Sequence, residues 1–265
     1  IENANLNYTD QIWLTIPLND EEKIGRVMNE LQGSMIEIKL LPNMRSFSLF
    51  NLPITYIGSQ PIINLSASPI DGINSLIKFV EDKILSAAIL LLVTPAMLAI
   101  AILVKLNSPG PIFYSQERMS WNGKKFRMIK FRSMPVDTEE KTGVAWAKED
   151  DNRATTVGRF LRKTSLDELP QFWNVLKGDM SVVGPRPERP VFVDKFKQEI
   201  PRYMQKHKVK AGITGWAQIN GWRGNTDLEK RIEYDIHYIE NWSLLFDLKI
   251  IYLTLAKGFN HPNAY

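Results

Sequence analysis

An uncharged run of 21 residues, ILSAAILLLVTPAMLAIAILV at positions 84–104, constrains this chain more than any other stretch. As a straight helix it would be about 32 Å long, close to the hydrocarbon thickness of a bilayer. A core helix of a soluble domain is the alternative, and the length and lack of polarity disfavour it. Thr94 and Pro95 fall in the middle of the run, where proline lacks an N–H and should bend the helix. The sequence therefore predicts a membrane-associated helix with a break at Thr94–Pro95.

The two flanks of this run differ in charge. Residues 78–83 carry two lysines and two acids, whereas residues 105–132 carry seven basic side chains and a single acid, Glu117. A basic excess beside a membrane segment favours the anionic cytoplasmic leaflet, at about 1 kcal/mol per charge near the surface. We therefore expect the C-terminal flank to be cytoplasmic. The N-terminal flank is balanced, so a complete crossing stays the alternative to re-entry.

The N-terminal stretch is expected to form one β-α-β unit. QIWLTI at residues 11–16 is typical of a buried strand, and Asn19 or Asp20 can cap the helix that follows. Residues 35–41 are typical of a second strand, so a parallel pair is predicted. No G-x-G-x-x-G is present to support a nucleotide site. Because the chain begins at Ile1, we expect a fragment or a processed form.

Composition narrows the classes of partner. A chain of 265 residues with 44% hydrophobic and 23% charged residues is typical of folded protein, in one or two domains. The net charge of +4 allows nucleic acid, but no basic run, zinc pattern or stacking motif supports that partner. We expect no nucleic acid, and attribute the charge to anionic lipid or a phosphorylated substrate. Without cysteine there is no disulfide, thiol nucleophile or thiolate metal site.

The best candidate for a reactive site is LRKTSLDELPQFWNVLKGDMSVVGPRP, at residues 161–187. Asp167 and Glu168 are adjacent where a helix should begin, because Ser165 and Glu168 have capping-box spacing, and Gly178 should end that helix. A helix start favours carboxylates and phosphate alike. With nearby arginines and a stiff Gly-Pro-Arg-Pro turn, the stretch suits phosphoryl chemistry with a divalent cation. An ordinary capped helix is the alternative.

Coarser predictions cover the rest of the chain. Asn122-Gly123 predicts a hairpin between two strands. The other segments are expected to be a mobile charged loop near the site at residues 137–151, a surface helix at 189–200, a loop at 212–224, a polar helix at 227–240, and an apolar segment at 242–256. The last segment suits either a membrane interface or packing onto the core.

The string of motifs resembles the bacterial polyprenyl-phosphate sugar-phosphate transferases, the monotopic phosphoglycosyl transferases that start glycan assembly on a membrane lipid. Their R-x-x-S-L-D-E-L-P-Q…N-V-L-x-G-x-M-S-x-V-G-P-R-P signature occurs here from Arg162 to Pro187. The likeness extends over SPGPIFYSQER, KFRSM, GITGWAQINGWRG and YDIHYIENWSLLFDLKI, and covers about residue 78 to the C-terminus. Ser120 and Ala211 depart from the family's glycine and proline, and a common basic pair appears here as Lys78-Phe79.

The resemblance implies an α/β protein in three parts. Residues 1–70 would be a partial Rossmann-like regulatory or structural domain. Residues 71–107 would be a linker and a re-entrant membrane helix-break-helix. Residues 108–265 would be a small, mostly helical α+β catalytic domain with interfacial amphipathic helices. The protein would lie in the bacterial inner membrane, with its catalytic domain on the cytoplasmic face.

The resemblance also implies a reaction. Asp167 would attack the sugar-linked phosphate of a UDP-sugar, and the resulting aspartyl phosphosugar would be transferred to undecaprenyl phosphate. Glucose 1-phosphate is the expected group, with galactose 1-phosphate next, and Mg²⁺ would be held by Glu168 and Asp167. The phosphate-binding residues would be Arg118, Arg132, Arg162, Pro185, Arg186, Pro187 and Arg223. A catalytically silent scaffold is the alternative, and a homo-oligomer is left open.

Overall fold

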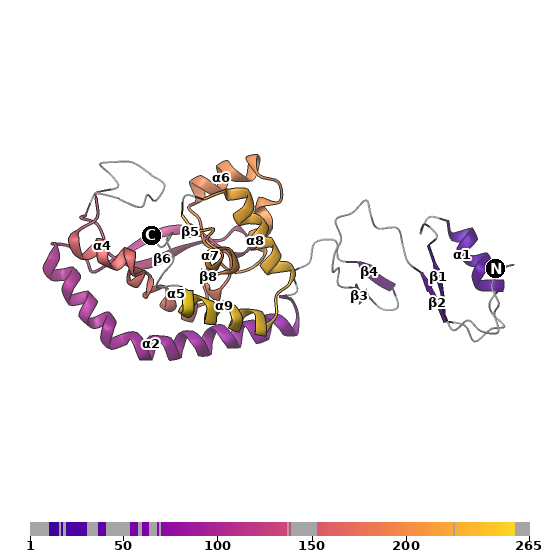
Figure 1. The fold of residues 1–265 in the computed structure, drawn as a ribbon, viewed down its shortest axis with the longest axis horizontal. Coiled ribbons are helices and arrows are strands. Elements are labelled where there is room, and N and C mark those ends of the chain that lie inside the picture. The colour runs from indigo at the N-terminus through magenta and orange to yellow at the C-terminus, as the bar shows by residue number, and fades with distance from the viewer. Residues whose placement is uncertain are drawn as a thin grey trace. The chain divides into compact units, whose positions relative to one another are not determined.

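The computed structural model describes residues 11–15, 17, 20–30, 37–40, 54–57, 60–63, 68, 70–136, 138, 153–224 and 226–257. The chain divides into two compact units, residues 1–66 and residues 67–265, and each is described by itself. Figure 1 shows the order of their helices and strands. The expected loop at residues 137–151 lies, apart from Thr138, outside the described residues.

The first unit contains the predicted β-α-β arrangement. Strand β1 (Gln11–Leu14) is followed by helix α1 (Glu21–Glu30) and strand β2 (Glu37–Leu40). The two strands pair in parallel, with Ile12 opposite Ile38, so this prediction is confirmed. A second, antiparallel pair, β3 (Ile54–Ile57) and β4 (Gln60–Ile63), was not predicted. A larger Rossmann-like domain stays a prediction.

The apolar run forms part of helix α2 (Ile73–Asn107), which has 35 residues and starts before the run does. Among the residues that the structure describes, α2 is the only helix long and apolar enough to cross a membrane. It passes through Pro95 without the expected break at Thr94–Pro95, as one curved helix (Figure 1). Pro95 cannot donate to the Leu91 carbonyl, but the Thr94 hydroxyl donates to the neighbouring Leu90 carbonyl at 2.6 Å. One missing bond in so long a ladder bends the helix without unwinding it.

Both ends of α2 pack against the second unit. Near the N-terminal end, Asp82 and Ser86 are buried. Near the other end, Ile100 and Val104 pack with Phe131. Between these contacts the helix presents apolar side chains to the outside, and Leu91, for example, is 81% exposed. The helix therefore lies along the rest of the second unit, to which it belongs, instead of projecting from it.

A hairpin packs against the C-terminal part of α2 through Phe131. Strands β5 (Phe113–Met119) and β6 (Lys125–Phe131) are antiparallel, as predicted. The chain reverses in a 3₁₀ turn, η2 (Trp121–Gly123), where Asn122 has a φ of 54° and Gly123 one of 69°. Asparagine and glycine tolerate these left-handed angles, which explains why this dipeptide marks the turn.

Helices make up most of the remaining unit. The helices predicted near residues 189–200 and 227–240 are confirmed, and the apolar segment expected at 242–256 forms a helix as well. The helices of this part are α4 (Thr156–Lys163), α5 (Gln171–Lys177), α6 (Pro190–Glu199), α8 (Leu228–Glu240) and α9 (Leu244–Lys257). A short 3₁₀ helix, η4 (Tyr203–Lys208), follows α6. Asp227 caps α8 by accepting from the Lys230 N–H at 3.1 Å. Helix α8 is polar in composition, as predicted, but its inner face is buried and includes Arg231 and Asp235.

Helix α9 has two contrasting faces. Asp247 and Ile250 are fully buried against the core, whereas Leu245 and Tyr252 are 77% and 69% exposed. Packing onto the core is therefore confirmed for one face. The exposed face keeps the apolar character expected at a membrane interface.

A short parallel pair lies at the centre of the core. Strands β7 (Ser181–Val183) and β8 (Gly212–Thr214) pair, and Val182 and Val183 are almost fully buried. The expected loop at residues 212–224 is thus wrong in its first half, which contains β8 and helix α7 (Trp216–Ile219). The backbones approach so closely at Gly184 and Gly212 that a Cβ on either one would overlap the other segment. Glycine is required there by space.

We expect Gly212→Ala to lower the free energy of unfolding by about 1–3 kcal/mol, the usual cost of overpacking a core. The added methyl group would overlap the Gly184 nitrogen and the Thr214 carbonyl oxygen, which are backbone atoms and cannot rotate away. Denaturant unfolding of the purified protein measures the change. Gly25→Ala, on helix α1 with nothing near its Cβ, is the matched control and should not destabilise. Equal unfolding curves for Gly212→Ala and wild type would contradict this account of β7–β8 packing.

Candidate active site

A pocket of about 520 Å³ opens between the β5–β6 hairpin and the segment that follows β7. Its walls hold many more basic than acidic side chains. The basic ones are Arg118, Lys130, Arg132, Arg153, Arg162, Arg186, Arg189, Arg223 and Arg231, and the acidic ones are Asp167, Glu168 and Glu188. Such a concentration of positive charge in a concave site attracts a polyanion, and a diphosphate is one of suitable size.

The carboxylate pair lies in a single 3₁₀ turn, η3 (Leu166–Glu168), and not at the start of an α-helix. The predicted capping box is wrong, because Ser165 has a φ of 55° and its side chain caps nothing. Its hydroxyl accepts instead from both terminal nitrogens of Arg223, each at 3.3 Å. Pro170 has no N–H to continue an α-helical ladder, so α5 begins only at Gln171. The end predicted at Gly178 is confirmed, with a φ of 104°.

Glu168 is surrounded by cations. Its Oε1 accepts from Arg186 Nη2 at 2.7 Å and from Lys130 Nζ at 2.8 Å, and Arg223 Nη2 lies 3.5 Å away. Arg186 also donates to Oε2 at 3.4 Å. Burial opposes ionisation, but the three cations outweigh it and hold the pKa of Glu168 well below its usual range. Glu168 is therefore a permanent negative charge that orders the arginines around it.

Asp167 has the opposite electrostatic environment. Burial, together with the charge of Glu168, raises the pKa of Asp167, while Lys130 and Arg223 act against the rise. The Lys130 nitrogen lies 4.0 Å from Asp167 Oδ2. Adjacent carboxyls whose pKa values are pushed apart are typical of an acid pair with divided roles. Glu168 is thus held by short ion pairs to Arg186 and Lys130, whereas the Lys130 nitrogen lies farther from Asp167.

The structure brings most of the predicted site residues together. The pocket lining includes both acids together with Arg118, Arg132, Arg162, Arg186, Pro187 and Arg223. Pro185 is not among the lining residues, and its carbonyl instead accepts from the Gly212 N–H at 2.9 Å. Its place in the structure is thus at the contact between β7 and β8.

Arg132 reaches the pocket wall with its guanidinium already bonded to backbone. Nη2 donates to the Ser108 carbonyl at 2.7 Å, and Nη1 donates to the Pro109 carbonyl. These bonds hold the turn that connects α2 to β5. Arg132 therefore has a clear role in tying the apolar helix to the hairpin, beside any contact with a phosphate.

Sequence reasoning missed Lys130 and Gln218, as well as Arg153, Glu188, Arg189 and Arg231 of the pocket wall. Lys130 was counted only in the basic excess, although its nitrogen lies 4.0 Å from Asp167 and 2.8 Å from Glu168. Gln218, on α7, accepts from Arg186 Nη1 at 3.3 Å and so helps to orient that arginine. The motif KFRSM contained the signal for Lys130, but only the fold shows that β6 passes next to η3.

The residues present fit a magnesium ion only in part. Within the part of the chain that the structure describes, no group of three or more histidine, aspartate or glutamate side chains is arranged to hold a metal. Magnesium, however, commonly binds through one or two carboxylates and the phosphates of its substrate. Asp167 and Glu168 supply those two groups, although Glu168 is engaged by Arg186 and Lys130.

The acid pair is thus buried in a basic pocket, in the same unit as the long apolar helix α2. Residues 73–261 match the family described as bacterial sugar transferase, and the chain belongs to that family. The resemblance seen in the sequence is thereby confirmed.

Two named relatives are similar over the entire chain and a third over most of it. It is 43% identical over 269 residues to a UDP-glucose:undecaprenyl-phosphate glucose-1-phosphate transferase of Escherichia coli (strain K12), covering 100% of this chain and 58% of the relative. It is 44% identical over 271 residues to a protein of the same name from Xanthomonas campestris pv. campestris, covering 100% of this chain and 56% of the relative. A UDP-N-acetylgalactosamine-undecaprenyl-phosphate N-acetylgalactosaminephosphotransferase of Aeromonas hydrophila is 44% identical over 204 residues, 76% of this chain and 47% of the relative. The chain thus spans little more than half the length of the first two relatives.

We expect Lys130→Met to raise the pKa of Asp167, because the variant removes a positive charge that stabilises the ionised carboxylate. Titration of ¹³C-labelled aspartate carboxyls by NMR measures the shift, and loss of one signal in Asp167→Asn assigns it. Lys124→Met is the matched control, since Lys124 lies over the Trp121 ring at the hairpin turn. An Asp167 titration that does not move in Lys130→Met would contradict the electrostatic description of the pair.

Proposed function

We propose that this chain transfers a hexose 1-phosphate, first of all glucose 1-phosphate, from a UDP-sugar to undecaprenyl phosphate. The products are UMP and an undecaprenyl diphosphate-sugar, which makes this the first membrane step of exopolysaccharide, capsule or O-antigen assembly. The observation that carries the proposal is the carboxylate pair at the base of the basic pocket, with Glu168 ion-paired to Arg186 and Lys130.

The reaction is proposed to have two steps. An oxygen of ionised Asp167 attacks the sugar-linked phosphorus, a new O–P bond forms, and the bond to UMP breaks with its electron pair leaving on UMP. An oxygen of undecaprenyl phosphate then attacks the same phosphorus, and the Asp167 carboxylate is released unchanged. The two bulky anions thus use the site one after the other.

Each ordered side chain has a share in that chemistry. Arg186 and Arg223 flank the acids and can neutralise the charge on the two non-bridging oxygens of the sugar-linked phosphate. The charge of Lys130 opposes the rise in the pKa of Asp167 and so favours the ionised carboxylate, and Lys130 lies near enough to bind a phosphate oxygen. Because Asp167 is buried, its nucleophilic oxygen is poorly hydrated, which raises its reactivity.

Magnesium is proposed as the cofactor, held by Asp167 and Glu168. When bound, it would neutralise charge on the diphosphate and make UMP a better leaving group. Support comes from the adjacent carboxylates, which are of the kind that magnesium binds together with substrate phosphates.

The sugar is proposed from the names of the relatives. Relatives at 43% and 44% identity are named for glucose 1-phosphate, and another at 44% is named for N-acetylgalactosamine phosphate. Identity over the chain therefore favours glucose without excluding a galactose-type sugar. A panel of UDP-sugars tests this directly.

We further propose that α2 enters the membrane and leaves it on the same face, which is the cytoplasmic one. Asp82 near one end of the helix and Val104 near the other are both buried against the same catalytic unit. If α2 crossed the bilayer, its two ends would lie on opposite sides of the membrane. The polar unit that contacts both ends would then have to extend through the hydrocarbon layer. The basic flank at residues 105–132 favours the cytoplasmic side.

In a UMP-release assay with UDP-glucose and undecaprenyl phosphate, we expect Asp167→Asn to lower turnover by about 10³-fold or more. Without acceptor lipid, wild-type protein should take up label from UDP-[¹⁴C]glucose, and Asp167→Asn should take up none. Asp194→Asn, an exposed aspartate on α6, is the control and should behave as wild type.

Near-normal turnover in Asp167→Asn would remove Asp167 as the nucleophile. If wild-type protein released no UMP from any UDP-sugar, the proposed activity itself would be wrong, and the chain would act as a scaffold.

For the topology of α2, single cysteines at Ser75 and Asn107 should both react with an impermeant maleimide from the cytoplasmic side of sealed vesicles. Both positions are exposed, and the chain has no native cysteine to give background. Prior lysis of the vesicles is the control for accessibility. Labelling of Ser75→Cys from the opposite side only would show that α2 crosses the membrane.

A further inference from the structure

Strand β7 pairs with β8 along one of its two edges, and β8 leaves the other edge uncovered. On the covered side, the Ser181 N–H donates to the Ala211 carbonyl at 2.8 Å, and the Gly184 N–H donates to Thr214 at 2.9 Å. Within the described residues, β7 pairs with β8 alone, so its other edge has no neighbouring strand. Buried backbone groups on such an edge need other partners.

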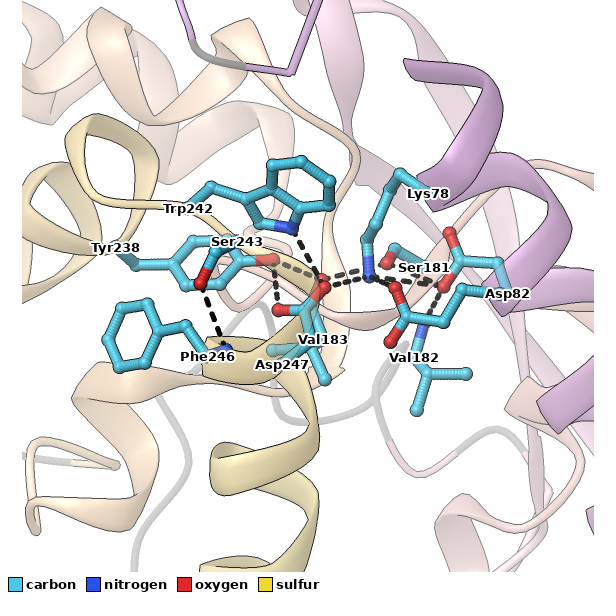
Figure 2. A network of polar contacts seen from close by, with 11 residues as sticks. Lys78, Asp82, Ser181, Val182, Val183, Tyr238, Trp242, Ser243, Phe246 and Asp247 are labelled. Carbon is cyan, nitrogen blue, oxygen red and sulfur yellow. Dashed lines mark hydrogen bonds and ion pairs between the residues drawn. The ribbon is translucent and has the colours of Figure 1, made fainter. Parts of the chain in front are cut away.

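Those partners are side chains, and Asp82 of α2 is the principal one (Figure 2). Its Oδ1 accepts from the Val182 N–H at 2.9 Å and from the Ser181 hydroxyl at 2.9 Å. From α8, the Tyr238 hydroxyl donates to the Val183 carbonyl at 3.1 Å. Two helices therefore complete the uncovered edge of β7.

The edge that Asp82 completes leads directly to the active site. Gly184 follows β7 and packs against Gly212, and Arg186 comes two residues later and binds Glu168. Pro185 and Pro187 restrict the backbone on either side of Arg186. A displacement of β7 is thus passed on through a stiff segment to the guanidinium of Arg186.

Asp82 is itself fixed in place. Lys78, one turn earlier on α2, lies 3.3 Å from Asp82 Oδ1 and 2.7 Å from Asp247 of α9. Figure 2 shows these side chains converging from α2 and α9 next to β7. Glu81 belongs to the same group: it lies 3.5 Å from Lys78, and Asp247 also acts on it by charge and hydrogen bonding.

We propose that Asp82 is a positioning residue for Arg186, so that the seating of α2 against β7 sets the arginine of the active site. Helix α2 would then position a side chain of the active site as well as anchor the protein in the membrane. Its kinetic consequence rests on the proposed sugar-phosphate transfer, whereas its structural consequence does not.

The structural test is hydrogen–deuterium exchange of the full chain in lipid nanodiscs. In Asp82→Ala, the backbone N–H groups from Val182 to Arg186 should exchange faster than in wild type, whereas those of α8 should not change. Glu81→Gln is the matched control, since it alters the neighbouring carboxylate of the same group and should leave residues 182–186 protected. Unchanged exchange at residues 182–186 in Asp82→Ala would overturn the proposal.

The kinetic test is a double-mutant cycle with Arg186→Lys. Asp82→Ala should lower kcat/KM for UMP release by about 10²-fold, the cost of a misplaced catalytic group. In the Arg186→Lys background the same change should cost much less, because the arginine that it positions is absent. A loss of the same factor in both backgrounds would show that Asp82 acts on stability alone, and would overturn the proposal.

Asp82→Asn keeps the tests decisive if Asp82→Ala does not fold. An amide oxygen still accepts from the Val182 N–H, but more weakly than a carboxylate. The Val182 N–H should therefore exchange faster than in wild type, and kcat/KM should fall less in the Arg186→Lys background than in wild type, both by smaller amounts than with Asp82→Ala. The proposal would be overturned if residues 182–186 exchanged as in wild type and Asp82→Asn lowered kcat/KM by the same factor with and without Arg186→Lys. If wild-type protein releases no UMP, the proposed function fails, while the exchange measurement still decides the role of Asp82.

Discussion

The buried ion pair between Lys78 and Asp247 is the contact on which the arrangement of the catalytic unit depends. The Lys78 nitrogen lies 2.7 Å from Asp247, which is fully buried and also accepts from the Tyr238 hydroxyl and the Trp242 indole, each at 2.8 Å. Such a pair adds little net stability, because taking two charges out of water costs about as much as their attraction returns. Removing one partner, however, costs about 3–5 kcal/mol, since the other charge stays buried without compensation. The pair therefore specifies one register of α2 against α9 and β7, and disfavours every other.

That register extends to the chemistry through a short path of backbone. Helix α2 holds β7, β7 leads to Gly184 and Arg186, and Arg186 fixes Glu168 at 2.7 Å. Glu168 then acts on its neighbour, because its permanent charge and the burial of the pair raise the pKa of Asp167. Under the proposed mechanism, Glu168 supplies a structural charge and Asp167 is the acid that reacts. The two adjacent carboxylates differ because Arg186 and Lys130 bind Glu168 at 2.7 and 2.8 Å, whereas Lys130 lies 4.0 Å from Asp167.

How far the sequence predicted this molecule depended on how local each signal was. The hairpin at Asn122-Gly123 and the helix capped by Asp227 were predictable, because turn and cap geometry are set by a few neighbouring residues. The capping box at Ser165 failed although its spacing was right, because Arg223, distant in the sequence, engages that hydroxyl. Lys130 and Gln218 could not be assigned to the site for the same reason, since only tertiary packing brings β6 and α7 beside η3. Arg186 was identified through its motif, yet nothing local indicated that α2 orients it.

The same packing also explains how a helix with polar residues can lie against lipid. Lys78 and Asp82 interrupt the apolar character of α2 in the sequence, but both are turned into the protein and buried. Between the two ends of the helix the outward face is apolar, with Ile84 64%, Leu91 81% and Leu98 63% exposed. Charged residues on the inner face therefore hold the catalytic unit, and apolar residues on the outer face can remain in the hydrocarbon layer without burying an unpaired charge. Under the proposed same-face topology, a lipid-borne acceptor stays in that layer while its phosphate reaches the basic pocket, so the helix that meets the lipid is also the helix that orders the pocket.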